Sequence, residues 1–426
     1  MKHEELQHYY AEAQPMPMDE STLERLRTLF VTDWEHWDWN EHAEVTREQA
    51  AEDIECFFDL LCFCYAGYEY YADKVDFAGL KDQILGSLPE RMTAMEVKNA
   101  FYHPLKQYIN DTHFYFLTGD ASSFRRAYCA YFTGITVAET ADGYAVLEDD
   151  TGIFGIGYIF TFENIKEYLF ETFPAPDGTR RYLIGTLSPE KMENILLDGV
   201  SCPVHRCRTD AAETCEKQMM ETERDGVPVV YHTNYRVDEN AENPFEPFRK
   251  SGEKYRDSDV LVWSVLNNCG GSSSYPAHFV RGLNDHAVWE VNGSILKNPL
   301  LDETVKESVK TYQTFLGGEK IDHTQATYNG KLFVLQNKGV ASSGEAAVKF
   351  AQSVKNICFV GSATSGCGQF GENRGYRLPN SGVTFHMGYK VFNMDGFEEG
   401  KGIAPDYWLD TTDPVGAVVE YIKTLK

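Results

Sequence analysis

The chain has 426 residues, of which 65 are acidic and 39 basic, and its formal net charge is −26. Such an acidic surface repels phosphate groups, which argues against nucleic acid or an anionic membrane as a partner. The length predicts two or three domains, and a content of 42% hydrophobic and 24% charged residues is typical of a globular protein.

The first residues and the cysteines bear on the compartment of the protein. No apolar run is as long as a membrane-spanning helix, so no membrane span is expected. Met1 to His8 lack the apolar stretch of a signal peptide. As written, the sequence predicts a cytoplasmic protein, or a secreted one if a leader has been removed. The ten cysteines follow no disulfide spacing, and we expect free thiols.

Residues 1–113 are expected to form a helical domain. Between Thr46 and Asn110, apolar residues recur at helical spacing in three successive stripes. Thr93 followed by Glu96 is a capping-box signature at the start of the third stripe. The stretch ends with Asp111-Thr112-His113.

Residues 114–227 are expected to form a β-rich module, because short apolar runs alternate there with turn residues. One short helix is predicted at Asn164–Phe170. A zinc site is an alternative reading of the cysteines and histidine near the end of the module, Cys202, His205, Cys207 and Cys215. Their spacing matches no four-ligand pattern, so free thiols in a loop are favoured and no metal or cofactor is expected.

Residues 228–426 are expected to form an α/β core. Apolar strands are predicted near Val229, Val260, Leu332 and Ile357, and they alternate with helices that begin at Tyr275 and Ser343. A hairpin around Val383 to Val391 and a last helix at Pro414–Lys423 complete the pattern. Strands alternating with helices predict a layered α/β fold.

One stretch of the core, Tyr328 to Ser353, carries the strongest indication of chemistry. A buried strand at Leu332–Leu335 runs into a turn at Gly339, and a helix begins at Ser342. Glu345 completes a capping-box signature with Ser342 as the N-cap. The serine would then lie beside free backbone N–H groups that can hold a developing oxyanion in acyl transfer. The local pattern alone favours a simple cap.

Four motifs in order change that weighting. They are Asn268-Cys269-Gly270-Gly271, Ser342-Ser343-Gly344-Glu345, Gly361-Ser-Ala-Thr364-Ser-Gly366 and Glu399-Gly400-Lys401-Gly402-Ile403-Ala404-Pro405-Asp406. Together they resemble the C-terminal processing (tail-specific) peptidase family, which includes the tricorn core and the interphotoreceptor retinoid-binding protein. The resemblance implies a ClpP/crotonase-like layered core, a serine peptidase without a cofactor, and a peptide or unfolded-protein substrate. It also implies that the β-rich module gates substrate, as a PDZ domain often does in this family.

The resemblance assigns roles to individual residues. Ser342 is the expected nucleophile, and the backbone N–H groups of Ser343 and of Gly270 or Gly271 are the expected oxyanion donors. The tail-specific branch uses a downstream lysine as base, but this chain has Cys367 at that spacing. The tricorn-like branch uses a histidine from the first core strand and a glutamate from the tail. These positions hold His232 and Glu399, which we therefore predict as base and supporting carboxylate.

Alternatives remain for the base and for the activity. His232 can instead be a packed strand histidine, since a slip of one residue reverses the face of a strand. The helical region of the family also ends in an Asp-x-His turn, which makes His113 a second candidate base, unless it only ends a helix.

The family often has Asp-Leu-Arg before its glycine turn, where this chain has Ser264-Val265-Leu266. That change and the missing lysine motivate a second hypothesis, an inactive relative that binds a peptide or small ligand. An esterase acting on small esters is a third.

Overall fold

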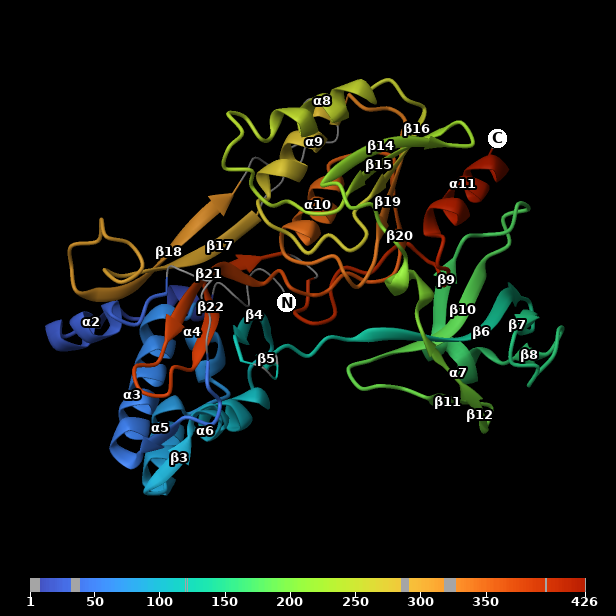
Figure 1. Ribbon diagram of the computed structural model, residues 1–426. Coiled ribbons are helices and arrows are strands. Elements are labelled where there is room, and N and C mark those ends of the chain that lie inside the picture. Colours follow the sequence, from blue (N-terminus) through green and yellow to red (C-terminus); the bar gives the residue numbers. More distant parts are fainter. Residues whose placement is uncertain are drawn as a thin grey trace. The chain divides into compact units, whose positions relative to one another are not determined.

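The computed structural model describes residues 8–31, 39–118, 120, 122–284, 291–317, 327–394 and 397–425 (Figure 1). The chain forms two compact units, each built from separate stretches of sequence. Unit 1 comprises Met1–Arg126, Glu290–Gly317 and Cys367–Gly400. Unit 2 comprises Ala127–Trp289, Gly318–Gly366 and Lys401–Lys426.

Unit 1 begins with helices, as the apolar stripes predict. Its helices are α2 (Glu20–Arg27), α3 (Arg47–Cys64), α4 (Tyr68–Ala72), α5 (Phe77–Ser87) and α6 (Ala94–Lys106). The predicted capping box at the start of α6 is confirmed, because Thr93 and Glu96 bond each other's backbone N–H groups. Two short strands, β2 (Glu44–Thr46) and β3 (Arg91–Thr93), pair antiparallel just before α3 and α6.

An antiparallel sheet completes unit 1. Its order is β1 (Met16–Pro17), β18 (Val309–Gly317), β17 (Val291–Lys297), β22 (Thr384–Asn393), β4 (Asp111–Phe116) and β5 (Ser123–Phe124), and β21 (Phe370–Arg377) pairs with β22. The predicted hairpin around Val383 to Val391 is thus the second strand of the β21–β22 pair. The helices pack on this sheet through aromatic rings: Phe57 of α3 stacks on Phe101 of α6 at 3.8 Å and lies 5.2 Å from Phe385 of β22.

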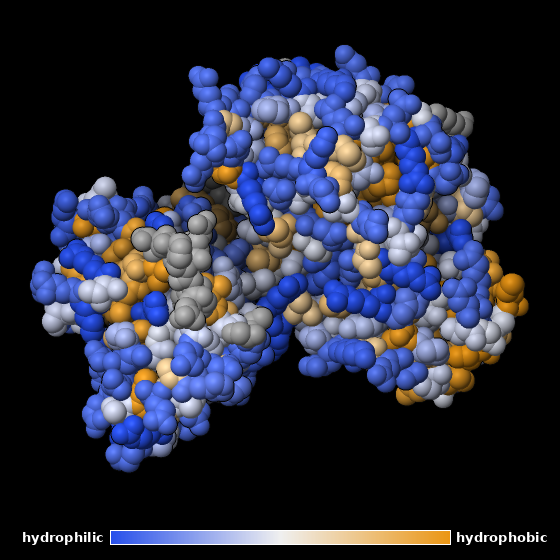
Figure 2. Space-filling model, viewed as in Figure 1, coloured by the Kyte–Doolittle hydropathy of each residue, from blue (hydrophilic) through white to orange (hydrophobic). Residues whose placement is uncertain are grey.

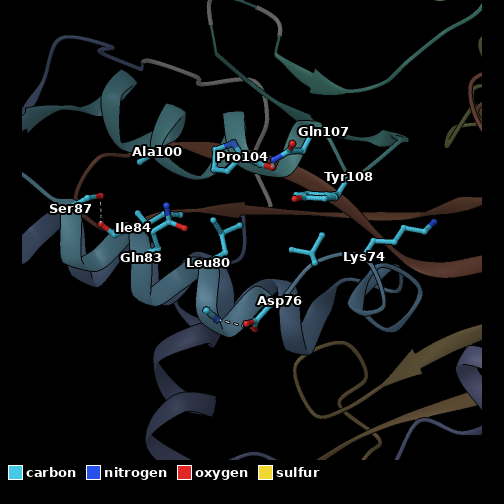
Figure 3. A pocket seen from close by; sticks show the side chains of 12 residues that line it. Lys74, Asp76, Leu80, Gln83, Ile84, Ser87, Ala100, Pro104, Gln107 and Tyr108 are labelled. Atoms are coloured by element: carbon cyan, nitrogen blue, oxygen red, sulfur yellow. Dashed lines mark hydrogen bonds between the residues drawn. The ribbon is translucent and has the colours of Figure 1, made fainter.

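A surface pocket of about 540 Å³ lies in the helical part of unit 1. Figure 3 shows Leu80 and Ile84 of α5 together with Pro104 of α6 and Gln107 just after it. The Asp76 carboxylate at its rim accepts the Gly79 N–H at 2.9 Å and thereby caps α5. The residues that line this pocket include none of the sequence-predicted site residues, so the predicted site lies elsewhere.

The first part of unit 2 is the β-rich module. Its main sheet has the order β8 (Ile159–Phe160), β7 (Gly143–Asp149), β6 (Cys129–Thr140), β10 (Arg181–Ser188) and β9 (Leu169–Thr172), with β13 (His205–Arg206) also on β6. A separate hairpin joins β11 (Asn194–Leu197) to β12 (Val200–Pro203). The helix predicted at Asn164–Phe170 is wrong in its bounds. Helix α7 spans only Phe162–Ile165, a 3₁₀ turn follows at Lys166–Tyr168, and Leu169 already begins β9.

Apolar side chains gather on the surface of this module, where Figure 2 shows orange atoms over β7, β8 and the β11–β12 hairpin. Ile156 is 81% exposed and Leu196 64% exposed. The loop that carries Ile156 is fixed, because the Asp149 carboxylate accepts four N–H groups of the loop, those of Thr151, Gly152, Phe154 and Gly155. The exposed apolar surface is therefore a built feature of the module.

The second part of unit 2 is a three-layered α/β core. Its sheet has the order β14 (Met219–Arg224), β15 (Val227–His232), β16 (Val260–Ser264), β19 (Lys331–Gln336), β20 (Ile357–Gly361) and β23 (Tyr407–Trp408). All neighbouring pairs are parallel except β14–β15. Its helices are α8 (Glu246–Lys254), α9 (Ser274–Asn284), α10 (Ser343–Ala351) and α11 (Pro414–Thr424). The predicted core strands and helices are confirmed.

Alternation along the core strands decides which helix covers which face. Val229, Phe333 and Cys358 share one row of the sheet and pack with the apolar side of α11. Trp263 points to the opposite face, where it contacts Phe279 of α9. Among the residues that the structure describes, every helix is too short or too polar to span a bilayer.

Candidate active site

Ser342 lies where β19 gives way to α10, and its backbone conformation is unusual. Its φ is 53° and its ψ −121°, a region that residues other than glycine rarely adopt. Its side chain makes no capping hydrogen bond to α10, so the predicted capping box is wrong. Strain of this kind persists only where the surroundings enforce it, and it concentrates at functional sites.

Glu345, the other half of the predicted box, points into the core of unit 2. Its side chain is fully buried, and Oε1 accepts the Thr364 hydroxyl at 2.5 Å and the Gly366 N–H at 2.8 Å. These donors belong to the Gly361–Gly366 motif. The glutamate therefore joins the first turn of α10 to the loop after β20.

The glycine turn after β16 lies directly against the Ser342 turn. A Cβ on Gly270 would lie 2.9 Å from both the Ala341 carbonyl oxygen and the Ser342 Cβ. The φ of Gly270 is 103°, which also favours glycine. The Ser343 hydroxyl donates to the Gly271 carbonyl at 2.6 Å. The structure thus brings together the residues of two motifs that are more than 70 positions apart in the sequence.

This close approach gives a prediction for stability. Gly270→Ala should lower the free energy of unfolding by about 1–3 kcal/mol more than Gly226→Ala does, because only the first substitution forces atoms together. Gly226 is a matched control, since it also has a positive φ, 78°, but a Cβ added there would have no heavy atom within 4 Å. Chemical denaturation of both variants measures the difference. Equal losses would show that Gly270 is required only for its φ.

The backbone N–H groups of the site differ in whether they already donate a hydrogen bond. The Gly270 N–H donates to Asn268 Oδ1 at 3.0 Å. No hydrogen bond within the described part of the chain uses the N–H of Gly271 or that of Ser343. These two groups are therefore available to an acceptor beside Ser342, as an oxyanion site requires.

Asn268, to which the motifs assign no role, connects the parts of this site. Its Nδ2 donates to the His232 carbonyl at 3.0 Å, and its own carbonyl accepts the Ala341 N–H at 3.0 Å. The side chain is fully buried. It therefore ties the end of β15 and the turn before Ser342 to the glycine turn.

The predicted base His232 is fully buried, with its ring on the α8 and α9 face of the sheet. Its Nδ1 accepts the Trp263 indole N–H at 3.0 Å, and the rings of Phe248 and Phe279 each lie 4.7 Å away. Burial lowers the pKa of His232 to about 3. The structure thus links His232 to the site through its backbone carbonyl, while its ring belongs to an aromatic cluster.

Burial of neutral His232 predicts a pH dependence of stability. The unfolded chain takes up a proton below the ordinary pKa of 6.5, whereas the folded chain does not until about 3. Stability should therefore fall as the pH drops through this window. His232→Gln keeps an acceptor for Trp263 but does not titrate, so its melting temperature should decline less between about pH 7 and pH 4. His8→Gln, at an exposed histidine, is the control and should follow the wild type.

A second group of predicted residues meets in unit 1. His113 lies on β4, and the Cys367 sulfur is 3.4 Å from its Nδ1 and 3.6 Å from its Nε2. The Asp111 carboxylate accepts the His113 N–H at 2.7 Å and the Tyr65 hydroxyl at 2.9 Å. Burial raises the pKa of Asp111 to about 7 and lowers the pKa of His113 to about 4.

Glu399 joins the segment that carries His113 to the segment that carries Cys367. One carboxylate oxygen accepts the Thr112 N–H at 3.0 Å, and the other accepts the N–H groups of Gly368 at 3.3 Å and Gln369 at 3.0 Å. Thr112 precedes His113, and Gly368 follows Cys367. The predicted supporting carboxylate thus lies in unit 1 with His113, whereas His232 belongs to unit 2.

Sequence comparison finds a family match for part of the chain. Residues 245–409 match the model of peptidase family S41. No curated protein matches the chain. One similar solved structure is mature CPAF complexed with lactacystin, with 14% identity, a TM-score of 0.48, and coverage of 89% of this chain and 98% of that chain. The photosystem II D1 C-terminal processing protease has 14% identity, a TM-score of 0.38, and coverage of 86% of this chain and 94% of that chain. The tricorn protease has 12% identity, a TM-score of 0.41, and coverage of 89% of this chain and 37% of that chain.

The mixed helices and strands of the chain, together with this match, support an α/β protease fold, and the ClpP/crotonase-like layout stays a prediction. The matched segment contains the glycine turn, the Ser342 turn and Glu399. Residues 245–409 thus match peptidase family S41, and the resemblance to the C-terminal processing peptidases is confirmed.

Proposed function

We propose that this chain is a serine peptidase that hydrolyses peptide bonds through an acyl-enzyme on Ser342. The observation that carries the proposal is the backbone of Ser342, which is strained at φ 53° and lies at the start of α10 beside two available N–H groups. A serine that serves only as a cap needs neither the strain nor the close glycine turn. The substrate class we propose is a peptide or an unfolded protein.

The reaction follows from these groups. The Ser342 Oγ attacks the carbonyl carbon of the scissile peptide bond, and the carbonyl oxygen becomes an oxyanion that the N–H groups of Gly271 and Ser343 stabilise. The C–N bond then breaks and the amine leaves with the proton that the base received from Ser342. A water molecule hydrolyses the ester in the same way and restores the serine.

For the base, two histidines stay candidates, His232 and His113. The His232 ring is fully buried among aromatic side chains, and its Nδ1 already accepts the Trp263 N–H. His113 instead lies among motif residues, beside Cys367 and next to the segment that Glu399 holds. Its lowered pKa keeps the ring neutral near pH 7, the form that accepts a proton. With His113 as the base, Glu399 would act by holding the backbone just before His113 and just after Cys367.

An inactive binding relative is the less favoured function. One reason for this hypothesis is Leu266, an apolar residue where the family often has arginine. Packing explains Leu266, because it is 1% exposed and belongs to the apolar core beneath α11. The second departure, Cys367, leaves a histidine in contact with the thiol. Neither change removes a group that the proposed reaction uses.

Labelling with a fluorophosphonate probe tests the proposal, because such probes react with a serine only when a base and oxyanion donors activate it. Peptide mass spectrometry of the folded protein should locate the adduct on Ser342, and the adduct should be absent when the protein is denatured before labelling. A folded protein without an adduct, and without hydrolysis of an unfolded protein substrate, would support the binding function instead.

A further inference from the structure

A carboxylate of the β-rich module reaches the turn that leads to Ser342. Asp210 lies in the 3₁₀ turn Arg208–Ala211, which follows β13, and its side chain is only 5% exposed. Its Oδ1 accepts the Lys338 N–H at 3.2 Å and the Ser362 hydroxyl at 2.6 Å. Its other oxygen accepts the N–H of the Arg206 guanidinium at 3.4 Å. One oxygen therefore bridges the Ser342 turn and the loop after β20.

The turn from Asn337 to Ala341 is held at nearly every residue. The carbonyl of Thr209, the neighbour of Asp210, accepts the Asn337 side-chain amide at 3.1 Å. The Val340 carbonyl accepts the Ser365 N–H at 2.7 Å, and the Ala341 N–H donates to Asn268. Strained backbone is kept only when its surroundings over-determine it. Two of the hydrogen bonds to this turn, those of Thr209 and Asp210, come from the module and not from the core.

We infer that Asp210 is a positioning residue for Ser342, through which the β-rich module fixes the nucleophile turn. The inference rests on the proposed function. Without the carboxylate, the Lys338 N–H and the Ser362 hydroxyl lose their shared acceptor, and the turn and the loop are free to move apart. The Ser342 side chain would then leave its attacking geometry although no group that touches substrate has changed.

The neighbouring Asp410 provides a matched control. Its side chain is 7% exposed, and it accepts the Arg208 N–H at 2.7 Å and lies 2.7 Å from the His205 ring. Asp410 therefore binds the same segment of the module that carries Asp210, and these bonds run to the module and not to the Ser342 turn. Asp410→Ala and Asp210→Ala both remove one buried carboxylate from the contact between module and core.

The test is the second-order rate of fluorophosphonate labelling at Ser342, together with kcat and KM for an unfolded protein substrate. Asp210→Ala should lower the labelling rate and kcat by about 10–100-fold with KM little changed, the size expected of a misplaced nucleophile. Asp210→Asn, which keeps an oxygen acceptor, should restore most of the rate. Asp410→Ala should label at close to the wild-type rate.

Each outcome bears on the inference. Equal labelling of Asp210→Ala and wild type would overturn it, and so would an equal loss in Asp410→Ala, because the effect would then be general loosening of the module. A wild type that does not label at all would contradict the proposed function and not the positioning role. Should Asp210→Ala fail to fold, Ser362→Ala removes one of the two donors, and an unchanged labelling rate in that variant would equally overturn the inference.

Discussion

Ser342→Ala should abolish peptide hydrolysis and fluorophosphonate labelling while the protein stays folded. Removing a serine nucleophile lowers kcat by about 10⁴–10⁶-fold in serine peptidases, which leaves no measurable turnover here. Folding should survive, because the side chain makes no capping bond to α10. Labelling, hydrolysis of an unfolded substrate and circular dichroism of the same preparation measure the three properties.

Two further variants make this result specific. Ser353→Ala removes a buried hydroxyl that donates to the Phe350 carbonyl at 2.7 Å near the end of α10, so it should cost some stability but no activity. Ser342→Gly should be as inactive as Ser342→Ala but more stable, by about 1–3 kcal/mol, because glycine adopts this φ without strain. Activity in Ser342→Ala would move the nucleophile to another residue.

Loss of the general base should lower kcat by about 10²–10⁴-fold, so His113→Ala and His232→Gln together decide which histidine has that role. With His113 as the base, the pH profile is also predicted. A base must be unprotonated, and the pKa of His113 is lowered to about 4, so kcat/KM should stay level as the pH falls below neutrality and decline only near that value.

His232→Gln is the matched variant for this experiment, since burial lowers the pKa of both histidines but only His113 contacts Cys367. An inactive His113→Ala with an active His232→Gln would assign the role of base to His113, and the reverse pattern would assign it to His232. Loss of activity in both variants with normal folding would indicate that the aromatic cluster around His232 also supports the site.

Much of the fold was predictable, because local patterns are strong where burial is periodic. The strand at β19, the helix α10 and the last helix α11 follow from apolar spacing, and the α6 capping box follows from two residues. At Ser342 the same rule failed. A capping signature specifies which side chains can bond a helix start, but tertiary contacts with the glycine turn and with Thr364 decide whether they do.

The missing parts of the site depend on contacts between distant segments. Asn268, Asp210 and Lys338 carry no spacing signal, because each acts through hydrogen bonds to residues far along the chain. The pairing of β4 with β22 joins residues 115 and 386, which no local pattern reveals. The face of His232 depended on a strand register that a single sequence does not fix.

The late position of one stabilising segment bears on when the protein becomes active during its synthesis. Ile403 holds the loop after β20 from both sides: its N–H donates to the Thr364 hydroxyl at 2.7 Å, and its carbonyl accepts the Thr364 N–H and the Gln336 side-chain amide. Ile403 leaves the ribosome after the Ser342 turn and the Thr364 loop, because it follows both in the sequence. We expect the nascent chain to lack peptidase activity until Ile403 has emerged and has bonded Thr364, which would protect the chain and its neighbours on the ribosome.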